Sequence, residues 1–450
     1  MEEKGKTLRD IPAVRWMSLG IVAFSMMAAY FMIDVMAPLK PMLERELLWN
    51  SLDYGFFSSA YGWFNVFLLM LLFGGLILDR FGIRLTGKMA TGLMVAGALL
   101  KYGALVYPFS GAEVWGIKAS VFYAAIGYAI FGVGAEVAGI TVTKIIVKWF
   151  KGRELALAMG LQLALARVGT ILALSLSVPV AEYFATASAS VLLGTVLVSI
   201  GFIAYFIYSY YDMRLDKQLD EQLSFEDEVF RWADVKAIVS NRGFWLITLL
   251  CLLFYASIFP FLKYSSDLMV NKFGVEETLA GMISSLLPFG TMVLTPIFGN
   301  LYDRKGRGTD IMLAGTVIVF VVHLLLSIPF LDSWWLAVLL MVMLGLGFSM
   351  LPSALWPAVA VIVPEKQLGT AYGLIFYIQN IGLMVVPGVV GWMLERYGSE
   401  YAEDGIKTYD YTWPMVLFAF FALSAFWMAV LLKKENKIKQ YGLDLPNMKE

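Results

Sequence analysis

Two ionisable side chains lie in the middle of long apolar runs, where the chain otherwise avoids charge. Glu136 lies in "GVGAEVAGI" and Arg167 lies in "LALARVGT". A carboxylate accepts hydrogen bonds from an ammonium group, and a guanidinium presents a planar fork that matches a carboxylate. Such a pair can hold the two termini of a small zwitterion. It can also form a structural ion pair between two helices, or a proton relay if Glu136 titrates.

The composition indicates which solvent surrounds these runs. The chain has 450 residues, of which 60% are hydrophobic and 15% are charged, whereas soluble domains carry about 25% charged residues. Apolar runs of about 20 residues recur from end to end, and a helix of that length spans the ~30 Å hydrocarbon core of a bilayer. Strands of a membrane barrel would alternate instead. We therefore expect an all-α membrane protein.

The same counts argue against several classes of partner. The net charge of −1 gives no general attraction to nucleic acid, and one cysteine with one histidine cannot form a disulfide framework and makes a Cys/His metal site improbable. The sequence contains no ATP-binding loop. We expect no cofactor, no bound metal and no enzymatic activity. The expected partners are a small-molecule substrate and the lipid bilayer, with protons as a further candidate, and the expected state is a monomer.

The apolar runs predict twelve membrane spans in two halves. The spans are residues 15–37, 54–78, 88–109, 118–147, 155–180, 187–211, 243–263, 277–301, 309–330, 335–362, 370–395 and 412–432. The longest internal polar stretch separates the sixth span from the seventh. We therefore divide the chain into an N-terminal half (1–211), a cytoplasmic linker with an amphipathic helix (212–242) and a C-terminal half (243–450).

The distribution of Lys and Arg predicts the orientation of these spans. With the N-terminus inside, 25 of these residues fall on the cytoplasmic side and seven fall on the other side. Short cytoplasmic loops carry such an excess of Lys and Arg. Both termini are therefore expected in the cytoplasm.

The two halves repeat each other. "FGGLILDRFGIR" ends the second span and "FGNLYDRKGRG" ends the eighth, at an offset of 224 residues. The matched positions are Gly75, Asp79, Arg80 and Gly82 against Gly299, Asp303, Arg304 and Gly306, and Arg84 completes the first copy. Repeated halves in the same orientation are typical of secondary transporters.

This repeated loop resembles the signature G-x-x-x-D-R-x-G-x-[RK] of the major facilitator superfamily. The resemblance implies twelve transmembrane helices in two six-helix pseudo-symmetric halves, with helices 1, 4, 7 and 10 lining a central cavity. We expect Gly75 to permit close helix approach and Asp79 to accept hydrogen bonds where the halves meet. The alternative is a basic turn that only fixes topology.

Further blocks resemble the lysosomal dipeptide uniporter family within that superfamily. They are "KWFKGRELALAMGLQLALARVG", "NVFLLMLLFGGLILDRFGIR" and "FYASIFPFLKYSSDLMVNKFG". In that family a Glu of helix 4 and an Arg of helix 5 hold the termini of a dipeptide, which implies these roles for Glu136 and Arg167. Neither tail contains an acidic dileucine sorting signal, so we expect a bacterial plasma membrane rather than a lysosome.

The spacing of Glu136 and Arg167 agrees with that role. They lie 12 and 13 residues from the two ends of the loop 148–154, which places both about 18–20 Å from the loop on neighbouring antiparallel helices. This depth is near the bilayer midplane, where a lone charge costs about 2.5–3.5 kcal/mol. Each charge must therefore face a partner or a water-filled cavity.

A repeat alignment at an offset of 213 predicts the facing wall. It matches Glu136 to Ser349 and Arg167 to Asn380. Ser349, Gln379 and Asn380 are expected to bond a peptide backbone from there. The other expected lining residues, which helix packing could also explain, are Asn65, Tyr30, Trp63, Tyr255, Trp356 and Tyr377.

Four polar residues lie outside this set. Asp34 near the outer end of helix 1 is a candidate gate, with a solvated helix end as the alternative. Lys263 is interfacial or part of that gate, and Lys101 either extends to the surface or pairs with Asp34. We expect His323 to be a packing residue.

The functional expectation is a transporter of dipeptides or similar small zwitterions that works by alternating access, as a uniporter. A proton-coupled carrier of small organic anions or amino acids is the alternative, with Arg167 as the anion site and Glu136 as the proton carrier. A receptor that does not transport is the third class.

Overall fold

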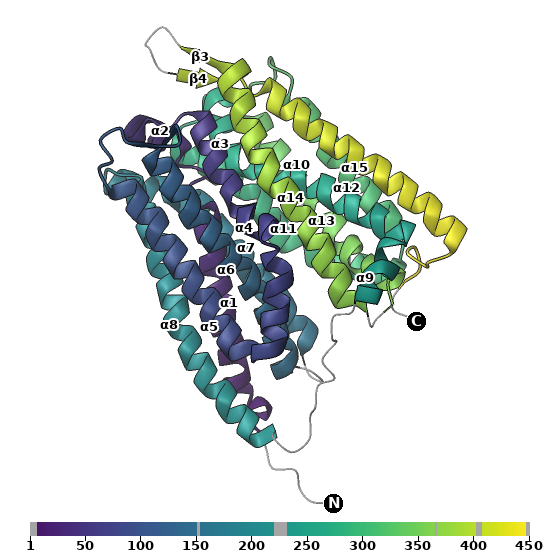
Figure 1. The fold of residues 1–450 in the computed structure, drawn as a ribbon. Coiled ribbons are helices and arrows are strands. Elements are labelled where there is room, and N and C mark those ends of the chain that lie inside the picture. Colours follow the sequence, from purple (N-terminus) through teal and green to yellow (C-terminus); the bar gives the residue numbers. More distant parts are fainter. Residues whose placement is uncertain (1–6, 151–153, 220–231, 365–366, 402–406, 447–450) are drawn as a thin grey trace, which may run out of the picture.

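A computed structural model describes residues 7–150, 154–219, 232–364, 367–401 and 407–446, without the side chains of 71, 72, 79, 156, 219 and 232–234. The chain forms two groups of helices that lie beside each other (Figure 1). The first group contains η1 (Leu8–Asp10), α1 (Pro12–Asp34), α2 (Lys40–Leu47), α3 (Ser51–Ser59), η2 (Ala60–Gly62), α4 (Trp63–Phe67), α5 (Met70–Val106), β1 (Glu113–Val114), β2 (Ile117–Lys118), α6 (Ala119–Phe150), α7 (Leu155–Tyr183) and α8 (Ser188–Leu219).

The second group follows the linker helix α9 (Trp232–Val239). It contains α10 (Arg242–Phe273), α11 (Glu277–Lys305), α12 (Gly308–Leu326), α13 (Trp334–Ile362), α14 (Leu368–Met393), the π-helical turn η4 (Leu394–Gly398), β3 (Ser399–Tyr401), β4 (Lys407–Tyr409) and α15 (Thr412–Lys439). The β-strands form two short antiparallel hairpins, β1–β2 and β3–β4. Helix α9 is the described part of the predicted amphipathic helix, and residues 220–231 lie outside the described part of the chain.

Eleven helices in the described residues are long and apolar enough to cross a membrane. The second predicted span, 54–78, is not one of them because it is interrupted. It consists of α3, η2, α4 and the first part of α5, and Leu69 has a left-handed backbone between α4 and α5. With this broken helix the architecture is the twelve-helix, two-half arrangement that the sequence predicts.

The two sides of the molecule differ in how closely the halves approach. We call the side that carries both chain ends the terminal face and the other side the distal face. The halves lie together at the distal face and diverge toward the terminal face (Figure 1). Every ion pair between described residues of different halves lies at the distal face.

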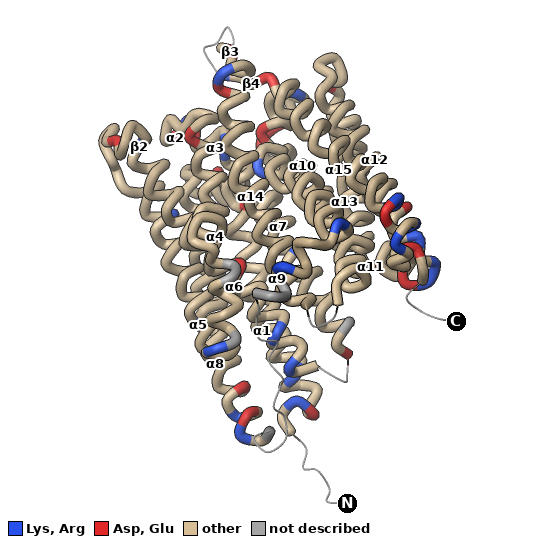
Figure 2. The backbone as a smooth tube through the Cα atoms, turned by 45° about the vertical axis from the view of Figure 1, so that its right-hand side comes forward, with Lys and Arg blue, Asp and Glu red and all other residues tan. Residues whose placement is uncertain are grey.

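Two backbone contacts hold the halves together at that face, and both depend on glycine. A Cβ on Gly281 of α11 would lie 2.2 Å from the Leu174 carbonyl oxygen of α7, and a Cβ on Gly391 of α14 would lie 2.3 Å from the Ser51 carbonyl oxygen of α3. Real side chains do not tolerate such distances, so these helices approach through the missing Cβ atoms. Charged residues gather mainly toward the two ends of the helices, and few lie in the middle of the molecule (Figure 2).

Candidate functional site

Arg167 lies in the middle of α7 and reaches the boundary between the two halves. Its guanidinium carbon lies 5.7 Å from the ring centre of Tyr30 on α1. It lies 5.9 Å from the ring of Phe259 on α10 and 5.5 Å from that of Phe348 on α13. Aromatic faces attract a cation at such distances. The three rings therefore orient the guanidinium while its planar fork of N–H donors stays available to a carboxylate.

Glu136 lies in the middle of α6 and also reaches the boundary between the halves. Tyr61 of η2 donates a hydrogen bond of 3.0 Å to its carboxylate. Asn380 of α14 in the other half is close enough to interact with the same carboxylate, although its amide nitrogen donates to the Phe376 carbonyl oxygen at 3.0 Å. Tyr61 satisfies only part of a carboxylate that has about four lone-pair positions, so Glu136 can still accept from an ammonium group.

The two charges are near each other but are not paired. Both side chains are described and half-buried, and no ion pair joins them. Tyr30 lies within electrostatic range of both. The structure thus differs from the structural ion pair between two helices that the sequence left open, because the aromatic rings hold the guanidinium and Tyr61 holds the carboxylate. The two opposite charges are therefore presented separately.

The three polar residues expected on the facing wall are placed differently from one another. Asn380 faces Glu136, as described above, and its buried amide oxygen has no hydrogen-bond partner in the described part of the chain. Gln379 is buried beside Cys251 of α10, whose sulfur lies 3.9 Å from its Oε1. Ser349 is fully buried, and its hydroxyl donates to the Gly345 carbonyl oxygen at 2.5 Å. Its hydroxyl also lies close to the Gly290 carbonyl oxygen of α11. Ser349 therefore faces α11 rather than the two charges.

Of the expected aromatic residues, Tyr255 and Trp356 contact each other and Tyr30 lies beside Arg167, whereas Trp63 and Tyr377 lie apart from them. Trp356 Nε1 donates to the Tyr255 hydroxyl at 3.3 Å. Tyr255 lies beside Phe259, with ring centres 5.2 Å apart, so this cluster is continuous with the rings around Arg167. Trp63 packs against Phe56 at 4.8 Å, and Tyr377 is half-buried on α14.

Asn65, the remaining expected lining residue, is fully buried. Its amide nitrogen donates to the Tyr61 carbonyl oxygen at 3.3 Å, and its amide oxygen has no partner among the described residues. It therefore lies behind Tyr61, one helical turn away, and supports the residue that bonds Glu136.

Asp34, the candidate gate, forms an ion pair that joins the two halves. Its carboxylate lies 2.6 Å from Lys263 Nζ of α10 and accepts a hydrogen bond of 2.8 Å from the Thr170 hydroxyl. Lys263 also donates to the Ile33 carbonyl oxygen at 2.7 Å. Asp34 is 4% exposed, so it is not a solvated helix end. The pair therefore joins α1 of the first half to α10 of the second half.

Lys101 behaves differently from either expectation. It is fully buried, and its ammonium group donates to the Met32 carbonyl oxygen at 3.0 Å and lies 4.7 Å from the Tyr128 ring. It neither extends to the surface nor pairs with Asp34, because a helix carbonyl and an aromatic face are within reach. His323 packs between Phe261 and Phe418, as predicted.

A second inter-half pair lies nearer the distal surface. Lys40 Nζ of α2 lies 2.8 Å from Asp267 of α10, and both side chains are buried. Tyr411 also donates to Asp267, and Tyr409 donates to Glu44 at 2.5 Å. Burial raises the pKa of Glu44, although the neighbouring Lys40 acts against this. The sequence reasoning did not identify this network.

The repeated loop has the expected turn in both halves. Gly82 and Gly306 have φ angles of +73° and +67°, which favour glycine. Gly75 was expected to permit a close approach, but no atom lies within 4 Å of a Cβ built there or on Gly299. The halves are apart at the terminal face, so Gly75 meets no helix of the other half. The neighbouring Gly74 makes a close approach instead, to Val137 of α6 in the same half.

Arg80 and Arg84 of the loop make their contacts within the first half. Arg84 pairs with Asp216 of α8 at 3.2 Å, and Arg80 is exposed with its guanidinium 5.5 Å from the Phe81 ring. Arg304 is exposed and Asp303 is half-buried. The side chain of Asp79 lies outside the described part, so its expected role stays a prediction.

Sequence reasoning missed three residues that contact the two charges. Tyr61, Phe259 and Phe348 are all aromatic, and the chain has too many aromatic residues for composition to distinguish them. A usable signal was spacing. Tyr61 lies four residues before Asn65, and Phe259 lies four residues after Tyr255, so each shares a helix face with a predicted residue.

Comparison with known proteins gives consistent matches over most of the chain. The model of the Major Facilitator Superfamily matches residues 20–268 and 256–443. The lysosomal dipeptide transporter MFSD1 of Homo sapiens is 30% identical over 401 residues, which cover 87% of this chain and 82% of that protein. The probable sulfoacetate transporter SauU of Cupriavidus necator is 23% identical over 400 residues, which cover 86% of this chain and 88% of that protein.

A solved structure shows the same fold. The nucleoside transporter NupG, solved as a mutant, superposes with a TM-score of 0.68 and 14% identity, covering 92% of this chain and 99% of that chain. At this identity the likeness concerns the fold alone.

Proposed function

The chain belongs to the Major Facilitator Superfamily, and from that premise we propose that it carries dipeptides or similar small zwitterions across a membrane by alternating access. The observation that supports this most strongly is the pair of opposite charges that do not form an ion pair with each other. Arg167 offers a guanidinium held by three rings, and Glu136 offers a carboxylate held by one tyrosine hydroxyl. Neither charge neutralises the other.

The proposed binding mode follows from the donors and acceptors. The substrate carboxylate accepts two parallel hydrogen bonds from Arg167, and the substrate ammonium donates to Glu136. Asn380 and Tyr30 lie beside these groups and supply neutral contacts to the peptide backbone. The cluster around Tyr255 and Trp356 limits the side-chain volume.

The ion pairs at the distal face indicate which step of the cycle this structure represents. The Asp34–Lys263 and Lys40–Asp267 pairs close that face, and the halves diverge at the terminal face. A cycle requires these pairs to break when the terminal face closes. We further propose uniport, since a Glu that binds the substrate ammonium must remain ionised while the substrate is bound.

The membrane and orientation are part of the proposal. Lys and Arg predominate in the loops of the terminal face, which supports placing both termini in the cytoplasm. We propose the plasma membrane as the location, whereas MFSD1 is described as lysosomal.

A second candidate is a proton-coupled carrier of small organic anions. It is favoured by one observation, that Arg167 has no carboxylate partner among the described residues and is therefore available to any anion. Glu136 would then carry the proton.

Blocked dipeptides distinguish these functions in a binding assay. The assay measures the thermal midpoint of the purified protein with a free dipeptide, its N-acetyl derivative, its C-terminal amide and a small carboxylate. The proposal predicts stabilisation by the free dipeptide and a loss with either block, since each removes one charged terminus. Equal stabilisation by the N-acetyl derivative and the carboxylate would contradict it and favour the anion carrier.

A further inference from the structure

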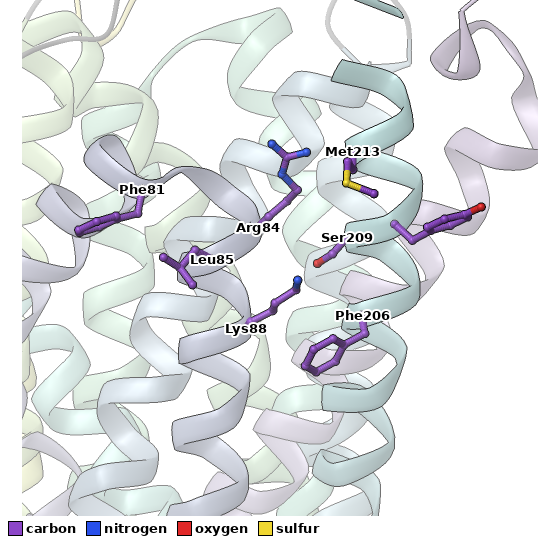
Figure 3. A pocket seen from close by; sticks show the side chains of 8 residues that line it. Phe81, Arg84, Leu85, Lys88, Phe206, Ser209 and Met213 are labelled. Carbon is purple, nitrogen blue, oxygen red and sulfur yellow. The ribbon is translucent and has the colours of Figure 1, made fainter. Parts of the chain in front are cut away.

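A pocket of about 490 Å³ lies on the first half, away from the two central charges. Its lining comes from α5 (Phe81, Arg84, Leu85 and Lys88) and α8 (Phe206, Ser209, Tyr210 and Met213). Figure 3 shows Arg84 and Lys88 of α5 extending toward Ser209, Met213 and Phe206 of α8, while the Phe81 ring points away from them. Helix α8 is on the outer edge of the molecule, distant from the second half (Figure 1). The pocket therefore faces the surroundings of the protein rather than the substrate path.

The walls of this pocket are apolar and open to the outside. Phe81, Leu85, Phe206, Tyr210 and Met213 are all exposed large side chains. The pocket lies near the terminal-face ends of two membrane spans, Arg80–Val106 and Ser188–Gln218. Acyl chains are the natural neighbours of apolar side chains at this level.

Two cations lie on the same face of α5 in this pocket. Arg84 and Lys88 are four residues apart, so their side chains are stacked along the helix. Arg84 is already paired with Asp216. Lys88 has no carboxylate partner among the described residues, and its ammonium lies 5.1 Å from the Phe206 ring. One positive charge therefore remains available beside an apolar wall.

A buried hydroxyl in the same pocket also lacks a partner. Ser209 is 4% exposed, and its Oγ makes no hydrogen bond with the described residues. A hydroxyl at this position would ordinarily donate to the carbonyl four residues earlier or to a neighbouring group. An unmet donor beside a free ammonium group is suited to an anionic oxygen ligand.

Together these features indicate one kind of occupant. We propose that this pocket binds an anionic phospholipid from the leaflet at the terminal face. Its phosphate oxygens accept hydrogen bonds from Lys88 and Ser209, and its acyl chains lie along Leu85 and Phe206. A free phosphate ion would leave the apolar walls without contacts, and a zwitterionic lipid would bring a second cation toward Lys88.

Native mass spectrometry of the full-length protein in detergent tests this proposal. The probes are phosphatidylglycerol, phosphatidylcholine and inorganic phosphate. We expect preferential retention of phosphatidylglycerol, and Lys88→Gln should weaken it about five-fold, which corresponds to roughly 1 kcal/mol. Ser209→Ala should weaken it by a smaller factor. The matched control is Lys434→Gln, which removes an exposed lysine near the terminal-face end of α15. This variant should bind the lipid like the wild type.

Three results would overturn the proposal. The first is equal retention of phosphatidylglycerol by Lys88→Gln and Lys434→Gln. The second is equal retention of phosphatidylcholine and phosphatidylglycerol by the wild type. The third is displacement of the bound lipid by millimolar phosphate, which would indicate a site for a soluble anion. Thermal midpoints of each variant show that lost binding does not reflect lost folding.

Discussion

Removing one charge of the Asp34–Lys263 pair should open the distal face. The two charged atoms lie 2.6 Å apart, and their side chains are 6% and 14% exposed. Asp34 belongs to the first half and Lys263 to the second, so the contact exists only while the halves are together at that face. The free-energy difference between the closed and open forms should therefore depend on it.

The size of the effect follows from burial. Removing one partner of a buried ion pair costs about 3–5 kcal/mol, because the other charge stays buried without compensation. In Asp34→Asn, Lys263 keeps the Ile33 carbonyl oxygen and the Tyr128 hydroxyl. We therefore expect the lower end, about 3 kcal/mol. Since 1.4 kcal/mol is tenfold in an equilibrium constant, the ratio of closed to open protein should fall about a hundredfold.

Pulsed electron paramagnetic resonance between two spin labels measures this ratio. Labels on Glu113→Cys in the first half and Glu400→Cys in the second occupy exposed positions at the distal face. The native Cys251 is buried, so it should not take up the label. Asp34→Asn should add a population at longer distance.

Two further variants make this test specific. The double variant Asp34→Asn with Lys263→Met removes both charges and should restore the short distance, because no unpaired buried charge remains. Lys118→Met breaks a pair with Asp53 inside the first half at the same face and should leave the distances unchanged. Unchanged distances in Asp34→Asn, or a double variant as open as the single one, would refute the gate.

Three other changes have defined outcomes. Arg167→Lys keeps the charge but loses the fork, so dipeptide affinity measured by calorimetry should fall at least tenfold; wild-type affinity would show that the guanidinium does not bind the carboxylate. Gly281→Val should abolish uptake because its Cβ meets a carbonyl of α7 at 2.2 Å, while Gly20→Val, with no atom within 4 Å, should be tolerated; equal uptake by the two variants would count against this contact. Burial raises the pKa of the Glu44 carboxyl above its ordinary value of 4.5, so the folded protein binds this proton more tightly than the unfolded chain does. The free energy of unfolding should therefore fall as the pH rises from 4.5 through the raised pKa. Glu44→Gln should lose that slope in thermal-midpoint measurements, and an unchanged slope would show that Glu44 is not its source.

The sequence predicted the fold because the solvent restricts the choices. Apolar runs of bilayer length must be helices, and the copies of the loop ending at Gly82 and Gly306 indicated two like-oriented halves. The broken second helix was not predictable, since its apolar pattern continues through the left-handed Leu69. Periodicity reports which face is buried and not whether the backbone is continuous.

The site was predictable in its charges and less so in its contacts. Glu136 and Arg167 stood out because charge is expensive at mid-membrane. Their separation was not evident, because it depends on the rings of Phe259 and Phe348 from the other half. The orientation of Ser349 was equally hidden, since a serine in a helix bonds its own backbone unless something else is nearer.

Uptake of a radiolabelled zwitterionic dipeptide by liposomes tests most directly whether the protein carries dipeptides between Arg167 and Glu136. With purified protein in the liposomes and empty liposomes as the control, we predict uptake that follows the concentration gradient and is little accelerated by an inward proton gradient. Arg167→Gln should reduce it to the level of empty liposomes. Wild-type uptake no faster than in empty liposomes would contradict dipeptide transport, and accumulation above the external concentration under a pH step, lost in Glu136→Gln, would replace uniport by proton coupling.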